Sequence, residues 1–154
     1  LLIYLIHTIN QCFFQKRGKI MENIQKMLEL AQICRLRAYT PYSHFKVGAA
    51  ILCENGNLFG GCNVENASFP CGTCAEAGAV SAMVAGGQSK IKEILIIADT
   101  TMILPCGNCL QKILEFGDEN TLIHSANLAG LVKTFKLCDL MPNFFKAGDI
   151  KNAQ

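Results

Sequence analysis

The sequence predicts an α/β domain in which one mixed β-sheet lies between layers of helices. Three observations predict it: a hairpin signal between two apolar runs, helical patterns that alternate with strand-length apolar runs after that hairpin, and a hydrophobic content of 51%. Alternating helices and strands are typical of a sheet that is covered by helices. A chain of 154 residues fits one domain, and its composition excludes a disordered or collagen-like protein.

The first half of the chain predicts a helix followed by a β-hairpin. Residues 21–39 carry apolar side chains at three- and four-residue spacing, and Pro41 ends this helical pattern. Two strand-like runs, 45–53 and 58–64, are joined by a segment that contains Asn-Gly. Asn-Gly between apolar runs is the strongest short hairpin signal.

The second half of the chain alternates helices with strands. Residues 74–85 are rich in Ala and Met and are followed by two glycines, so we expect a buried helix with a glycine stop. The apolar, β-branched run at 91–98 predicts a central strand that is covered on both faces. The remaining predicted elements are a helix over 106–116, strands over 121–125 and 131–137, and a tail of loop and short helix from Asp139.

The first twenty residues are interpreted as an extension, and residues 21–154 as the domain. The apolar run at 1–14 is shorter than a membrane span, is interrupted by polar residues, and has its basic residues after it rather than before it. We therefore expect no membrane anchor. The extension is expected to be disordered, or to be translated upstream of a true start at Met21.

Charge and cysteine content restrict the function classes. The formal net charge is only +2, so no basic excess exists to neutralise a row of phosphates, and a nucleic-acid polymer is not expected as a partner. Nine cysteines stand in a composition that is otherwise typical of a cytoplasmic enzyme. In such a chain cysteines serve as core residues, metal ligands or catalysts more often than as disulfide partners.

Two segments carry cysteines three positions apart at predicted helix starts: Cys71-Gly72-Thr73-Cys74-Ala75-Glu76 and Pro105-Cys106-Gly107-Asn108-Cys109. The N-terminus of a helix favours the thiolate form, and zinc is the natural metal for thiolates without a redox role. Parallel strands followed by helices would bring both helix starts to one edge of the sheet.

Two interpretations of a zinc site follow from these cysteines. All four could form a closed structural site, or Cys74, Cys106 and Cys109 could bind zinc and leave the fourth position to water. Glu76, two residues after Cys74, favours the second interpretation. A structural site has no use for a carboxylate there, whereas a hydrolytic site needs one to accept and return a proton.

The whole pattern resembles the small homotetrameric, zinc-dependent cytidine deaminase family. Cys-x-Glu followed by Pro-Cys-x-x-Cys is the three-cysteine signature of zinc-dependent nucleobase deaminases. The similarity extends to the segments Tyr42–Ala50 and Gly61–Ala67, in the same order as in the family, and covers about Met21 to Phe145. It implies a three-layer α/β/α fold with one mixed sheet of roughly five strands, and a homotetramer with sites shared between subunits.

The resemblance also implies a reaction and a set of site residues. The reaction is hydrolysis of cytidine and deoxycytidine to uridine and deoxyuridine plus ammonia in pyrimidine salvage, with one zinc ion per subunit. Glu76 would move the protons, and zinc would be bound by Cys74, Cys106 and Cys109. The implied substrate contacts are Phe45 to the pyrimidine, Asn63 and Glu65 to the ribose, the backbone of Ala75 to the base edge, and Phe145 to a neighbouring subunit's site.

The chain departs from the family at two positions. The family usually has Arg directly after Cys-Ala-Glu and often after the second Cys-x-x-Cys, where this chain has Ala77 and Leu110. We therefore expect a slower enzyme or one with a higher pH optimum. Two alternatives follow from the same residues: a deaminase of another aminated heterocycle, such as a nucleoside antibiotic or guanine, or a catalytically weak homologue with a structural zinc.

Overall fold

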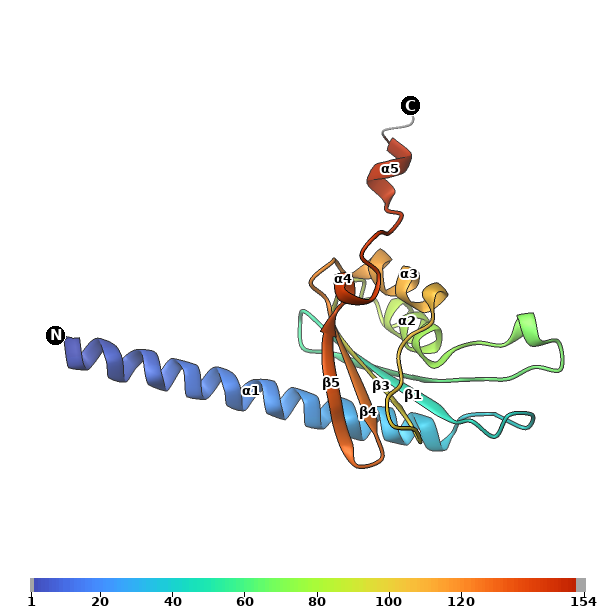
Figure 1. Ribbon diagram of the computed structural model, residues 1–154, viewed down its shortest axis with the longest axis horizontal. Helices are drawn as coiled ribbons and strands as arrows, with labels where there is room; N and C mark the ends of the chain where they lie inside the picture. Colours follow the sequence, from blue (N-terminus) through green and yellow to red (C-terminus); the bar gives the residue numbers. More distant parts are fainter. Residues whose placement is uncertain (1, 152–154) are drawn as a thin grey trace.

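The computed structural model describes residues 2–151, and its elements follow the predicted order (Figure 1). The five strands and the two helices that were predicted between residues 45 and 137 each begin and end within two residues of their predicted bounds. The full order is α1 (Leu2–Leu36), β1 (Val47–Cys53), β2 (Leu58–Cys62), the 3-10 helix η1 (Phe69–Cys71), α2 (Ala75–Ala85), β3 (Ile91–Ala98), α3 (Gly107–Phe116), β4 (Leu122–Asn127), β5 (Gly130–Lys136), α4 (Leu137–Leu140) and α5 (Ala147–Lys151).

The five strands form one mixed sheet in the order β2-β1-β3-β4-β5. β1 pairs antiparallel with β2 and β3, and β4 pairs antiparallel with β5. β3 and β4 are parallel, and α3 crosses between them. The prediction of a mixed sheet of about five strands is confirmed.

Helices cover both faces of the sheet, which confirms the three-layer architecture (Figure 1). Side chains alternate across a strand, so consecutive residues of β1 enter different cores. Ala49 and Ile51 pack in the core that α2 and α3 cover, whereas Ala50 and Leu52 pack against α1. β3 likewise contributes to both cores, with Ile94 and Ile96 in the first and Leu95 and Ile97 in the second, as expected for a central strand covered on both faces.

Helix α1 begins at Leu2, earlier than the helix predicted from residue 21, and the interpretation of residues 1–20 as a disordered extension stays a prediction. Its N-terminal part runs beyond the edge of the sheet, and only the later turns pack on the sheet through side chains such as Ile24, Met27 and Ala31 (Figure 1). Among the described residues, no helix combines the length and apolar character needed to cross a bilayer. The domain boundary at residue 20 and the start at Met21 stay predictions.

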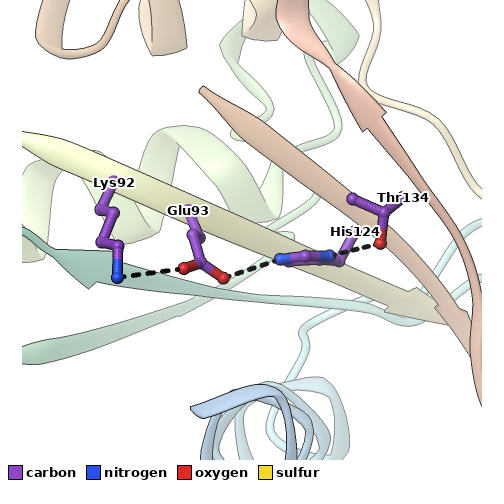
Figure 2. Close-up of polar contacts among 4 residues, drawn as sticks. All are labelled: Lys92, Glu93, His124 and Thr134. Carbon is purple, nitrogen blue, oxygen red and sulfur yellow. Dashed lines mark hydrogen bonds and ion pairs between the residues drawn. The ribbon is translucent and has the colours of Figure 1, made fainter. Parts of the chain in front are cut away.

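A buried polar chain crosses three strands on the face of the sheet that α1 covers (Figure 2). The Nε2 atom of His124 lies 3.0 Å from Oε2 of Glu93, and its Nδ1 atom lies 2.8 Å from Oγ1 of Thr134. Lys92 adds a contact of 3.4 Å to the other oxygen of Glu93. The side chains of His124 and Glu93 are only 2% and 5% exposed, so their contact is the buried part of this chain.

Candidate active site

Three cysteines meet where α2 and α3 begin. Cys74 is the N-cap residue of α2 and Cys106 is the N-cap residue of α3, both with extended backbone, and Cys109 lies in the first turn of α3. The ligand atoms of Cys74, Cys106 and Cys109 all lie within 4.8 Å of one another. Cys71 is exposed at the end of η1 and does not belong to this cluster.

The cluster fits a zinc ion by its donor chemistry. Burial raises the pKa of the Cys74 and Cys109 thiols, and the carboxylate of Glu76 raises both further. Two thiols of this kind become thiolates only when a cation is close to them, so the packing of three sulfurs favours metal binding. Three protein ligands at most 4.8 Å apart are the donor set of a catalytic zinc site.

The start of α3 supplies positive potential to the cluster. Burial by itself would raise the pKa of Cys106, but the backbone N–H groups of Cys109 and Asn108, together with the thiols of Cys109 and Cys74, lower the pKa overall. Free N–H groups at a helix start favour an anion. Leu110 is buried in the core and brings no charge to the cluster.

Glu76 stands beside the cluster in the first turn of α2. It is only 5% exposed, and it lines a cavity that Cys74 and Cys106 also line. Burial raises the pKa of its carboxyl group above the ordinary range, and the charge of Lys112 partly opposes this shift. A carboxyl group with a raised pKa is suited to accept and return a proton near neutral pH.

Two cavities meet at this cluster. The inner one has a volume of about 180 Å³, and the outer one has a volume of about 530 Å³. Asn63 and Cys74 line both of them. The inner cavity is also lined by Val47, Ala75, Glu76, Ile103, Leu104 and Cys106. Tyr42, Ser43, Val64, Glu65, Asn66, Phe69, Gly72 and Thr73 complete the outer one. No Lys, Arg or His belongs to either set.

Asn63 and Glu65 hold the loop that carries Phe45. The side chain of Asn63 donates to the backbone oxygen of Phe45 at 2.8 Å and accepts from the backbone N–H of Val47 at 2.8 Å. Glu65 accepts hydrogen bonds from the loop at Tyr42 and Ser43. These two residues therefore face the outer cavity and fix its wall at the same time.

The structure brings most of the predicted site residues together, with two exceptions: Phe45, which is 42% exposed, and Phe145 line neither of the two cavities. Ala75 lines the inner cavity beside Glu76, whereas Phe145 lies in the C-terminal segment and is 60% exposed. Its backbone oxygen accepts a hydrogen bond from Gln111 at 2.8 Å. Sequence reasoning did not find Ile103 and Leu104, because apolar residues in a loop carry no motif signal.

Comparisons with known proteins agree with this geometry. A family model described as the cytidine and deoxycytidylate deaminase zinc-binding region matches residues 21–125. Two similar proteins are a cytidine deaminase of Sporosarcina psychrophila, 35% identical over 85% of this chain and 97% of that protein, and one of Mycoplasma genitalium, 36% identical over 80% of this chain and 96% of that protein. A cytidine deaminase crystal structure from Burkholderia pseudomallei has a TM-score of 0.75 and 38% identity, with 79% of this chain and 98% of that chain covered.

Proposed function

The chain belongs to the cytidine and deoxycytidylate deaminase family, and from this membership we propose the reaction of its site. The enzyme hydrolyses cytidine and deoxycytidine: water adds to the amino-bearing carbon of the pyrimidine, and uridine or deoxyuridine and ammonia are released. The observation that carries this function is Glu76, a buried carboxyl group beside three clustered cysteines at the wall of a cavity. We further propose that the reaction serves pyrimidine salvage in the cytoplasm.

The residues of the site divide the chemistry between them. Cys74, Cys106 and Cys109 hold zinc. When bound, zinc supplies Lewis-acid activation of the attacking water. Glu76 accepts a proton from that water and passes it to the ring nitrogen beside the amino-bearing carbon, which makes this carbon electrophilic. After the water oxygen has bonded to that carbon, Glu76 accepts the remaining proton of this oxygen and delivers it to the departing amine, which leaves a carbonyl group on the ring; the raised pKa of Glu76 suits both directions of transfer.

The cavity walls suggest how the nucleoside is bound. In this proposal the pyrimidine enters the inner cavity, where the backbone of Ala75 binds the base edge and Phe45 packs on the ring. Asn63 and Glu65 bind the ribose at the junction with the outer cavity, which both residues line. The exposed Phe145, which lines neither cavity of its own chain, reaches the site of a neighbouring subunit in a homotetramer.

The charge of the cavity walls favours a nucleoside over a nucleotide. The described lining residues include two carboxylates, Glu65 and Glu76, and no cation. A phosphate group at the 5′ position would therefore find no positive partner and would be repelled by Glu65. Within a family whose model includes deoxycytidylate deaminases, this site fits the neutral substrate.

The proposed function is tested by assaying the purified protein with cytidine, deoxycytidine, CMP and dCMP, with and without a zinc chelator. We expect ultraviolet absorbance to show conversion of both nucleosides and at least about hundred-fold lower kcat/KM for the nucleotides. Chelation should abolish the conversion and added zinc should restore it. Equal rates on dCMP and deoxycytidine would contradict the argument from wall charge, and no turnover of cytidine by the zinc-loaded protein would contradict the reaction itself.

A further inference from the structure

The hydroxyl group of Ser43 joins two residues that face the substrate in the proposed function. It donates a hydrogen bond to Oε1 of Glu65, and it accepts one of 3.0 Å from the backbone N–H of Phe45. The backbone N–H groups of Tyr42 and Ser43 donate to Oε2 of Glu65 at 2.9 and 3.2 Å. Both carboxylate oxygens of Glu65 are therefore held by the loop that carries Phe45.

The backbone between Ser43 and Phe45 needs this support. His44 has φ 57°, the left-handed region, and it is the one non-glycine residue with positive φ among the residues that the structure describes. A residue with a Cβ atom adopts this conformation only where its neighbours hold it there. On one side the N–H of His44 donates to the oxygen of Thr40 at 3.1 Å, and on the other the N–H of Phe45 donates to the Ser43 hydroxyl.

We propose that Ser43 is a positioning residue of the deaminase. Its hydroxyl sets Glu65 and Phe45 in one geometry, so that the contact to the ribose and the contact to the pyrimidine are made together. This inference rests on the substrate-binding roles given to those two residues in the proposed function. The single hydroxyl proton of Ser43 is committed to Glu65, so its effect on the substrate passes through Glu65 and Phe45.

The position of Ser43 predicts which kinetic constant depends on it. The proton transfers belong to Glu76 on α2, and the metal ligands lie at the starts of α2 and α3. Ser43 lies on the separate loop between α1 and β1 and lines only the outer cavity. Removing its hydroxyl should therefore weaken substrate binding and leave the chemical step nearly unchanged, which is a rise in KM at constant kcat.

Three variants test the proposal: Ser43→Ala, Ser43→Thr, which keeps a hydroxyl group, and Ser81→Ala, a matched control at an exposed position of α2. We expect Ser43→Ala to raise KM for cytidine about ten-fold, with kcat within about two-fold of wild type. Ser43→Thr should restore KM to within about three-fold, and Ser81→Ala should change neither constant. Without substrate, the amides of Tyr42 and Phe45 should exchange hydrogen about ten-fold faster in Ser43→Ala than in wild type, and the other two variants should not show this increase.

Each other result overturns the proposal. A normal KM in Ser43→Ala, with fast exchange of the loop amides, would show that the hydroxyl only closes the turn. A loss in kcat without a change in KM would place Ser43 in the chemical step, and unchanged amide exchange would show that the hydroxyl does not hold the loop. Failure of the proposed function is distinguishable, since the zinc-loaded wild type would then not deaminate cytidine while exchange would still report on Ser43.

Discussion

Replacing His124 with Ala should destabilise the protein strongly although His124 lies outside the active site. The substitution leaves the carboxylate of Glu93, 5% exposed, without its partner at 3.0 Å and with only Lys92 at 3.4 Å (Figure 2). Leaving a buried carboxylate without its partner costs roughly 3–5 kcal/mol. Since Lys92 remains, we expect the lower end, about 3 kcal/mol, which corresponds to a fall in Tm of about 6–12 °C for a chain of this size.

A double-mutant cycle measured by urea or thermal unfolding isolates the interaction. His124→Ala combined with Glu93→Gln should cost less than the sum of the two single variants, by at least about 1 kcal/mol, because the buried charge is removed with its partner. Thr134→Ala is the control: Thr134 is exposed, so its hydroxyl can bond to water, and the loss should stay below about 1 kcal/mol. Additive single effects, or a loss below about 1 kcal/mol for His124→Ala, would refute the reasoning.

Four further outcomes are expected. The hydrogen bond from His124, together with the charges of His124 and Lys92, holds the pKa of Glu93 below its ordinary value. The stability that Glu93 contributes is therefore present above the pKa of the unfolded state and is lost as the pH falls through the pKa of the folded state. The difference in unfolding free energy between wild type and Glu93→Gln should shrink below about pH 4. Glu76→Gln should keep its zinc by metal analysis and lose about 10²–10⁴-fold in kcat; a wild-type rate would contradict its role. Cys109→Ser should lose zinc while Cys71→Ser retains it, and equal zinc contents in the two would contradict the three-cysteine site. Gly61→Ala should cost about 1–3 kcal/mol in urea unfolding, because a Cβ atom there would meet the backbone of α2 at Ala75 and Ala79, and a neutral result would refute that close approach.

The differences between predicted and observed element bounds have local causes. The predicted helices over 74–85 and 106–116 begin one residue later, because Cys74 and Cys106 are N-cap residues whose backbone is still extended. The first strand begins at Val47 instead of residue 45, since the backbone of Phe45 is bonded to the side chain of Asn63. Hydrophobic periodicity cannot report a bond between a side chain and a backbone 18 residues away.

The site could be predicted where its residues form short motifs. Cys74 and Glu76 are two residues apart, and Cys106 and Cys109 are three apart, so spacing and helix starts were sufficient to name them. The partners of Glu65 lie 22 and 23 residues earlier in the chain, and no motif connects them to it. The pairing of His124 could not be predicted either, because its partner Glu93 is 31 residues away.

The sequence by itself therefore determined the elements, their order and the chemistry-bearing residues, because periodicity, turn residues and ligand spacing act over a few neighbouring positions. Only the tertiary structure decided which of those residues meet. The parallel pairing of β3 with β4, and the packing of α2 and α3 on one face of the sheet, bring the three sulfurs within 4.8 Å. The same sheet places Glu93 beside His124 under α1. Such contacts join distant parts of the chain, and their geometry depends on the whole fold rather than on any local pattern.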